Sequence, residues 1–269
     1  MSTLNRRDFL KTSLAASATA ALAALPDSAR ASVAPASGEY YELRCYRLKA
    51  GASHALLDSY LEKAFIPAAN ARGVEAVGVF TEPDAKDGQA VWVLIPHPSL
   101  EVMASITSSL NADPAVQAAG IEYLSTPTKD QPAFDRIDSW IFLPFSGLPK
   151  LAVPQLARDG KPRVFELRTY ESFSELKALK KVAMFNAGEI GVMQEVNLSP
   201  VFYGQALVGR DLPHLTYMLC SADMAAHKKN WEAFLAHPVW IRLKNDPQYA
   251  DTVQKITSRF LVPAAFSQI

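Results

Sequence analysis

Strict alternation of apolar and polar positions marks the start of each half of the chain. Residues 40–48 and residues 163–171 both show the two-residue period of a strand. A helix is predicted after the first of them, because apolar residues return at three- and four-residue steps from Leu57 to Phe65. Pro67 falls inside this stretch and predicts a kink or an early end of the helix.

The later segments complete the same order of elements twice. Short apolar runs between turn residues predict strands, and longer amphipathic runs predict helices. The first half should hold strands over 76–81, 90–95 and 138–144 and a helix over 98–111, and the second half strands over 200–207, 214–220 and 257–263 and a helix over 222–236. Each half therefore has the order βαββαβ. This is the order of a ferredoxin-like unit, which carries both helices on one face of an antiparallel sheet.

The two halves also share residues in register. Tyr41 to Tyr46 read YELRCY, and Phe165 to Tyr170 read FELRTY 124 positions later. Asp113-Pro114 and His237-Pro238 keep this offset. Such a repeat predicts an internal duplication. Each sheet would have one bare face, and stacking the two bare faces buries both. We therefore expect an α+β protein of two tandem ferredoxin-like units stacked as a fused, barrel-like pair of sheets.

The first residues have the features of an export signal. Arg6-Arg7, an alanine-rich apolar run and an A-x-A cleavage site at Ala29-Arg30-Ala31 are typical of a twin-arginine signal peptide. The run from Thr12 to Leu25 is too short to span a bilayer. We therefore expect residues 1–31 to be removed, and the mature protein to be periplasmic or extracellular without a membrane span.

Composition excludes several classes of function. The chain has 27 basic and 27 acidic residues, and loss of the signal removes only four of the first and two of the second. The sequence lacks the stripe of basic residues that would indicate nucleic-acid binding. Cys45 and Cys220 are expected to be buried free thiols, because two distant cysteines do not make the dense framework of a disulfide-stapled domain. No metal-like or haem-like spacing of Cys and His occurs, so no metal and no cofactor are predicted.

Several motifs resemble those of the NIPSNAP family. They are the Tyr-Glu-Leu-Arg-x-Tyr strand with the glycine-opened helix after it, Pro213 to Leu219, Trp231 to Phe234, His237 to Trp240 and Tyr249 to Val253. The resemblance divides the mature chain into NIPSNAP-like domains over 38–145 and 163–269, joined by a linker over 146–162, and it is stronger in the second domain. It implies the dimeric α/β-barrel fold that small monooxygenases, isomerases and haem enzymes share. It does not imply one reaction.

The candidate site lies on the first strand of each half. We expect the apolar residues of these strands to face the helices, and the Glu, Arg and Tyr residues that alternate with them to face the barrel interior. Two interpretations stay open, because a buried charge needs a partner. Glu42 pairs with Arg44 or Arg168 to fix the packing, or the arginines bind an anionic or carbonyl ligand while a tyrosine donates a proton. On the second interpretation the catalytic residues are Arg168 and Tyr170, and the ligand-binding residues are Arg44, Tyr46, Glu166, Tyr217 and Trp240.

These features together predict an exported protein that binds a small aromatic or carbonyl-bearing molecule between its sheets. Cofactor-independent catalysis is an extension of this hypothesis. A non-catalytic scaffold or interaction protein is the first alternative, and a haem-dependent enzyme of the same fold is the second. Large side chains filling the space between the sheets would favour the scaffold. A small-molecule ligand is the expected partner, and formation of a homo-oligomer is left open.

Overall fold

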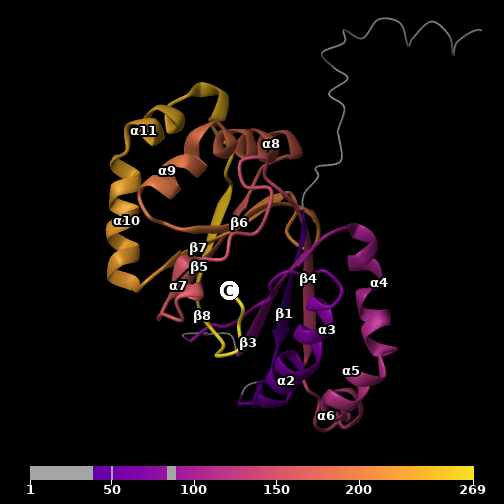
Figure 1. Ribbon diagram of the computed structural model, residues 1–269. Coiled ribbons are helices and arrows are strands. Elements are labelled where there is room, and N and C mark those ends of the chain that lie inside the picture. Colours follow the sequence, from indigo (N-terminus) through magenta and orange to yellow (C-terminus); the bar gives the residue numbers. More distant parts are fainter. Residues whose placement is uncertain (1–38, 50, 84–88) are drawn as a thin grey trace, which may run out of the picture. The chain divides into compact units, whose positions relative to one another are not determined.

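The computed structural model describes residues 39–49, 51–83 and 89–269, which belong to one compact unit. The expected signal peptide and its cleavage site lie outside the described residues. Figure 1 shows the described elements as a strand barrel with helices on its outside. The predicted mixture of helices and strands is confirmed.

The N-terminal half, residues 39–145, contains the four predicted strands. They are β1 (Tyr40–Arg47), β2 (Gly78–Thr81), β3 (Ala90–His97) and β4 (Arg136–Pro144). A helical segment follows β1 and consists of α2 (Ala55–Tyr60), η2 (Leu61–Phe65) and α3 (Ile66–Asn70). After β3 come α4 (Leu100–Asn111), α5 (Pro114–Ala119) and α6 (Ile121–Ser125). The last two helices extend the helical region beyond the single helix that the sequence predicts there.

The C-terminal half, residues 163–269, follows the same course. Its strands are β5 (Val164–Glu171), β6 (Pro200–Val208), β7 (His214–Ser221) and β8 (Lys255–Pro263). After β5 come α8 (Glu175–Met184), η3 (Phe185–Glu189) and α9 (Ile190–Glu195), and after β7 come α10 (Met224–Ala236), α11 (Pro238–Lys244) and η4 (Pro247–Tyr249). The short helix α7 (Gln155–Arg158) lies in the segment between the halves.

The eight strands of the described residues form one closed antiparallel barrel in the order β1-β3-β2-β8-β5-β7-β6-β4. The strand order is β4-β1-β3-β2 in the N-terminal half and β8-β5-β7-β6 in the C-terminal half. Pairing of β2 with β8 and of β4 with β6 joins the halves. The expected barrel-like arrangement of the two sheets is confirmed, with one refinement. The sheets do enclose a common core, but their edges are hydrogen-bonded to each other because an unpaired edge would leave backbone groups unsatisfied.

Both halves contain a π-helical segment at the same point. η2 and η3 begin 124 positions apart, at Leu61 and Phe185. Pro67 follows η2 in the first turn of α3, and the helix continues beyond it to Asn70. The C-terminal half has the same segment without a proline, so the proline is not its cause. Gly188 in η3 has φ of 154°, a conformation that favours glycine.

Each sheet buries both of its faces. Tyr46, Val79 and Val93 pack outward against the helices of the N-terminal half. Leu43 and Cys45 pack inward in the cluster that fills the barrel. The predicted orientation of the first strands is therefore wrong: their apolar residues face the barrel interior, and their Glu, Arg and Tyr residues face the helices. A two-residue period cannot decide between the faces when both carry apolar residues and both are buried.

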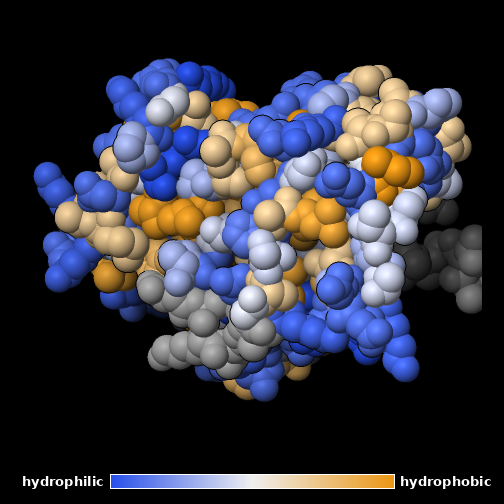
Figure 2. Space-filling model, turned by 90° about the horizontal axis from the view of Figure 1, so that it is seen from below, coloured by the Kyte–Doolittle hydropathy of each residue, from blue (hydrophilic) through white to orange (hydrophobic). Residues whose placement is uncertain are grey.

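The surface offers no simple apolar face in the view of Figure 2, where hydrophobic residues lie in separate patches among hydrophilic ones. None of the helices in the described part of the chain has both the length and the apolar character needed to cross a bilayer.

Candidate functional site

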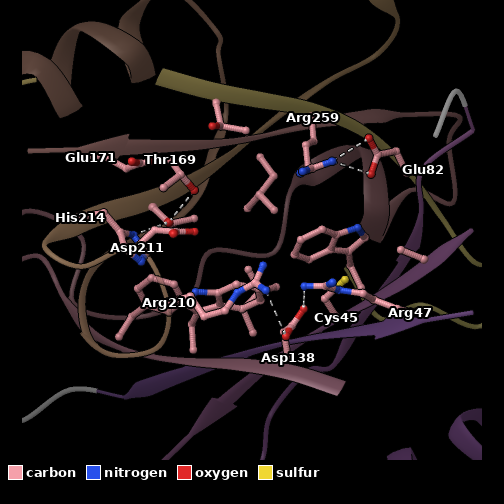
Figure 3. A pocket seen from close by; sticks show the side chains of 18 of the residues that line it. Cys45, Arg47, Glu82, Asp138, Thr169, Glu171, Arg210, Asp211, His214 and Arg259 are labelled. Atoms are coloured by element: carbon pink, nitrogen blue, oxygen red, sulfur yellow. Dashed lines mark hydrogen bonds and ion pairs between the residues drawn. The ribbon is translucent and has the colours of Figure 1, made fainter. Parts of the chain in front are cut away.

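One end of the barrel interior is hollow. A cavity of about 580 Å³ lies there, and its lining side chains point inward from β1, β3, β4, β5, β7 and β8 (Figure 3). The other end is filled by fully buried side chains, among them Tyr41, Phe165, Phe202 and Leu261. The packed end therefore forms the floor of the cavity.

The N-terminal half supplies the aromatic wall of the cavity. The rings of Trp92 and Trp140 are stacked, with centroids 6.1 Å apart and an angle of 19° between their planes. Phe142 and Cys45 line the same wall. Burial raises the pKa of the Cys45 thiol to about 12, so the thiol stays protonated. This wall offers flat apolar surface to a ring-shaped ligand.

The C-terminal half supplies hydroxyl groups and a histidine. The Oγ1 atoms of Thr169 and Thr216 lie 2.8 Å apart, and Thr216 Oγ1 lies 3.3 Å from Nδ1 of His214. Burial lowers the pKa of His214, so its ring is neutral at neutral pH. In Figure 3 His214 and Thr169 lie on one side of the cavity, across from Arg259 and Cys45. The two walls therefore differ in chemistry.

Charged residues around the cavity occur in pairs. The contacts are Arg259 with Glu82 at 3.1 Å, Lys255 with Glu171 at 2.7 Å, Arg210 with Asp138 at 3.9 Å, and Arg47 with Asp138. Asp211 adds a further carboxylate to the lining. Each basic side chain thus has a carboxylate within reach. This arrangement favours a ligand with little net charge, because a charged one would have to displace an existing pair.

The site residues that the sequence predicts lie on the opposite face of the barrel wall. In the N-terminal half, Arg44 donates to both carboxylate oxygens of Glu42, at 2.6 and 2.9 Å. Ser139 also donates to Glu42, and His97 Nε2 lies 3.0 Å from it. Burial alone would raise the pKa of Glu42, but the hydrogen bonds from His97 and Arg44 bring it down to about 2. Arg44 and Tyr46 thus face the helices instead of the cavity.

Glu166 occupies the centre of a matching network in the C-terminal half. Arg168 and Ser258 donate to Glu166 at 2.6 and 2.5 Å, and Trp231 Nε1 and His227 Nε2 each lie 2.9 Å from it. Burial would raise the pKa of Glu166, but the contacts with His227 and Arg168 hold it at about 2. This pairing of Glu and Arg within one strand is one of the two pairings that the packing interpretation allows.

Tyr170, Tyr217 and Trp240 belong to the same helix-facing region. The hydroxyls of Tyr170 and Tyr217 lie 2.8 Å apart. Beside them Lys181 pairs with Glu189 at 2.8 Å, and only 4% and 1% of these two side chains are exposed. Lys181 Nζ lies 5.4 Å from the centre of the Trp240 ring. The predicted residues of the C-terminal half therefore do lie together, but behind the barrel wall, while the two from the N-terminal half lie in their own network.

The residues that line the cavity were missed by sequence reasoning. Trp92 and Thr216 hold positions 124 residues apart, as do Cys45 and Thr169. The repeat offset therefore contains a usable signal, because it identifies strand positions at which the two halves differ in chemistry. Such positions point to a ligand more directly than the charged pairs that both halves share.

Cys45 and Cys220 are free and buried, as predicted. Within residues 39–49, 51–83 and 89–269, no group of His, Cys, Asp and Glu side chains is arranged to hold a metal ion.

Comparison with known proteins identifies two segments of the chain. The NIPSNAP family model matches residues 165–268, and the model of the TAT (twin-arginine translocation) pathway signal sequence matches residues 3–23. No curated protein matches the chain. The crystal structure of a putative monooxygenase from Lactobacillus acidophilus NCFM is similar with a TM-score of 0.51 and 9% identity, over 84% of this chain and 94% of that one.

Two further solved structures are similar. A putative monooxygenase from Fusobacterium nucleatum subsp. nucleatum has a TM-score of 0.52 and 9% identity, over 84% of this chain and 93% of that one. An uncharacterized NIPSNAP-like domain protein from Burkholderia xenovorans has a TM-score of 0.35 and 19% identity, over 39% of this chain and 88% of that one. At such identities a likeness to the monooxygenase-titled structures concerns the fold alone. Residues 165–268 are thus a NIPSNAP domain, in a chain that carries a twin-arginine signal sequence over residues 3–23.

Proposed function

We propose that this is an exported protein of the periplasm or the extracellular space that binds a small aromatic or carbonyl-bearing molecule inside its barrel. The observation that carries the proposal is the cavity of about 580 Å³, which lies within the size range of small-molecule sites. Trp92 and Trp140 provide stacking surface, and Thr169, Thr216 and His214 provide hydrogen-bonding groups for a hydroxyl or carbonyl.

Filling the cavity tests this proposal. Ala90 lines the cavity at the position that corresponds to His214, so the strand tolerates a larger side chain there. The Ala90→Trp variant should fold but lose the ligand. Native mass spectrometry of protein purified from its own host measures ligand retention, and circular dichroism checks the fold. Ala187→Trp, on an exposed position of η3, is the matched control.

The outcomes differ clearly. A retained small molecule in the wild type and in Ala187→Trp, with none in folded Ala90→Trp, supports the proposal. Equal retention in both variants places the ligand elsewhere, and the barrel is then not the binding site.

The networks around Glu42 and Glu166 have a packing role in this proposal. Each glutamate accepts hydrogen bonds from an arginine two residues later and from a serine of the neighbouring closing strand. Arg44 and Arg168 thus already have carboxylate partners, and neither reaches the cavity. The catalytic role first considered for Arg168 and Tyr170 would require a ligand to enter between sheet and helices.

The two alternative functions have less support. A scaffold does not need an open cavity with an aromatic wall and hydrogen-bonding groups across from it. A haem enzyme needs an axial ligand, and four of the five histidines lie against carboxylates: His54, His97, His227 and His237. Only His214 faces the cavity, with Nδ1 directed to a threonine hydroxyl. This donor set fits a hydroxyl-bearing organic ligand better than haem.

Two tandem ferredoxin-like units that arose by duplication are part of the same proposal. Support comes from the strand order, which is the same in each half. It also comes from the strand register, because Arg44 pairs with Val93 and Arg168 pairs with Tyr217, and both partners are shifted by the same 124 positions. A NIPSNAP-like domain over 38–145 is the corresponding proposal for the first half. Separately expressed halves that each give a cooperative unfolding transition would support independent units, and the absence of any transition would count against them.

Export depends on the arginine pair in this proposal. Changing Arg6 and Arg7 to lysine should leave the precursor in the cytoplasm, because the signal, and no contact of the folded protein, directs transport. Immunoblots of cytoplasm, periplasm and medium measure the distribution and separate the two compartments. Normal amounts of mature protein outside the cytoplasm in the variant would contradict the proposed route.

A further inference from the structure

The two walls of the cavity occupy equivalent ladder positions with different chemistry. Cys45 pairs with Trp92 in the N-terminal half, and Thr169 pairs with Thr216 at the positions 124 residues later. Likewise, His214 in the C-terminal half corresponds to Ala90 in the N-terminal half. A polar chain is therefore present in one half only. A packing requirement common to both halves does not explain it.

This chain joins the cavity to a buried histidine. Thr216 and His214 are 2% and 3% exposed, while Thr169 is half-buried and lines the cavity. A hydroxyl can donate one hydrogen bond and accept others. Thr216 can thus donate to Nδ1 of His214 and accept from Thr169, because the two distances are 3.3 and 2.8 Å. In that arrangement the lone pairs of Thr169 Oγ1 remain available to a ligand.

The charges that face His214 come from three elements. Glu171 of β5 pairs with it across the ladder, Arg210 and Asp211 lie in the turn before β7, and Lys255 of β8 pairs with Glu171. Hydrogen bonds to the backbone of Leu215 and Arg210 and the carboxylates of Asp211 and Glu171 favour a protonated ring. Burial is the largest influence and lowers the pKa of His214. The ring is therefore in its proton-accepting form at neutral pH.

We infer that His214 accepts, through Thr216 and Thr169, the proton of a phenol or enol hydroxyl on a ligand bound in the barrel cavity. The inference rests on the proposed function and specifies its ligand class. Stacked indoles at the aromatic wall suit a planar ring, and the neutral polar chain on the facing wall ends in a hydroxyl. The paired charges around the cavity disfavour a ligand that is already ionised in solution.

Proton transfer in this arrangement balances without any co-reactant. The ligand O–H bond breaks, and its electron pair stays on the ligand oxygen as phenolate or enolate. Thr169 takes that proton and passes its own to Thr216, which passes its own to Nδ1 of His214. One N–H bond forms, and both hydroxyls are regenerated. The positive imidazolium then lies across the threonines from the oxyanion, which offsets the cost of charging a buried ring. His214 is thus a positioning and proton-storing residue, while Thr169 touches the ligand.

The probe for this inference is 4-nitrophenol, whose anion absorbs visible light. Its binding to the mature protein is measured by equilibrium dialysis, and its ionisation when bound is measured by absorbance across a pH series. In the wild type the anion should persist to a pH about one unit lower than for the free probe, which corresponds to a roughly tenfold shift in its ionisation equilibrium.

Three variants separate the relay from general effects of the cavity. His214→Gln keeps a polar side chain but removes the base, and Thr169→Val keeps the shape but removes the first hydroxyl. Both should bind the probe and lose the shift. Thr257→Val is the matched control, because Thr257 lines the cavity from β8 outside the chain of hydroxyls, and it should keep the shift. Circular dichroism melting confirms that each variant is folded. Thr169→Val carries the test if His214→Gln does not fold.

The outcomes also distinguish this inference from the proposed function. If the probe binds to the wild type but ionises as it does in solution, the proton relay is wrong while small-molecule binding stands. If the shift survives in Thr169→Val or disappears in Thr257→Val, the threonine path is wrong. If the probe fails to bind to the wild type at all, both the relay and the ligand class in the proposed function are overturned.

Discussion

Five positions between the sheet and its helices are apolar in the N-terminal half, whereas in the C-terminal half they carry a lysine, a glutamate and three aromatic residues. The residues Leu57, Phe65, Val79, Val93 and Val116 correspond, 124 positions later, to Lys181, Glu189, Tyr203, Tyr217 and Trp240. The ladders support this equivalence, because Val79 pairs with Val93 and Tyr203 pairs with Tyr217. The same strands and helices therefore enclose two different interiors.

This difference separates what the fold needs from what it tolerates. The N-terminal half packs these positions with side chains that carry no polar atom, so the arrangement of strands and helices does not depend on the charges. Burying Lys181 and Glu189 costs desolvation that their attraction repays only in part. In contrast, each half has a Glu–Arg network, centred on Glu42 in one and on Glu166 in the other. This network is the structural feature that the two halves share.

The largest expected effect comes from breaking the buried pair that only the C-terminal half has. Lys181→Leu leaves Glu189 buried without its cation, and should lower the free energy of unfolding by roughly 3–5 kcal/mol. Urea denaturation measures the change. Lys228→Leu, on an exposed position of α10, is the control and should change little.

The double variant Lys181→Leu/Glu189→Phe sharpens the comparison, because it installs the residues of the N-terminal half. It should recover most of the lost stability. Failure to recover, with the fold intact at low urea, would mean that the charged pair has become part of the packing and that the two halves are no longer interchangeable there.

The next effect concerns pH and should be the same in both halves. The folded-state pKa values of Glu42 and Glu166 are about 2, below the ordinary value of 4.5. A carboxylate whose pKa is lowered by folding stabilises the folded protein at pH values above its pKa in the unfolded state. This stabilisation is lost as the pH falls from about 4.5 to 2. Each group should contribute about 3 kcal/mol to the loss. Unfolding curves of Glu42→Gln and Glu166→Gln across this range should each show a shallower acid dependence.

The pH measurement also tests the comparison at Glu189. Burial raises its pKa, so its ionisation favours unfolding as the pH rises, opposite in sign to the other two glutamates. This effect lies above pH 4.5, between the unfolded and the folded pKa of Glu189, where a Glu189→Gln variant should lose less stability than the wild type as the pH rises; a greater loss in the variant disagrees.

A smaller loss of stability should follow from removing either strand arginine. Arg44→Met and Arg168→Met each delete charged hydrogen bonds, with an expected cost of about 1.5–3 kcal/mol. The cost stays below that of Lys181→Leu, because Glu42 keeps His97 and Glu166 keeps Trp231. Thermal melts of the two variants should agree within experimental error. A much smaller loss for Arg168→Met alone would reopen its role as a ligand-binding residue.

The smallest effect compares the two thiols. Burial raises the pKa of Cys45 and of Cys220 to about 12, so both should react slowly with iodoacetamide at neutral pH. Cys45 lines the cavity, and Cys220 packs in the filled end of the barrel. Mass spectrometry of tryptic peptides should therefore show Cys45 modified first. Modification of Cys220 first would contradict the placement of the cavity.

The sequence predicted the positions of the strands correctly, but the side of each first strand that faces the barrel interior was predicted wrongly. The strand predicted over 40–48 is β1, Tyr40–Arg47, and the one predicted over 163–171 is β5, Val164–Glu171. Alternation gives the period of a strand but not its direction toward the core, and here both faces are buried. The polar residues were therefore assigned to the cavity when the tryptophans and threonines face it.

The strand pairing that joins the two sheets was beyond local sequence patterns. Pairing of β2 with β8 joins residues about 180 positions apart through only two paired residues on each strand, Phe80 and Thr81 with Pro263 and Val262. Backbone hydrogen bonds of this kind leave no mark on the composition of the strands. The short helices α5, α6 and α11 were missed because each has fewer than eight residues, too few for a helical period to stand out.

Joining both half-barrels in one polypeptide has a consequence for dilute solutions. A barrel that closes between separate subunits becomes less stable as protein concentration falls, because association is then part of folding. Here the seams between β2 and β8 and between β4 and β6 lie within a single chain. The unfolding midpoint of the barrel should therefore not change with protein concentration, and its cavity stays assembled at high dilution.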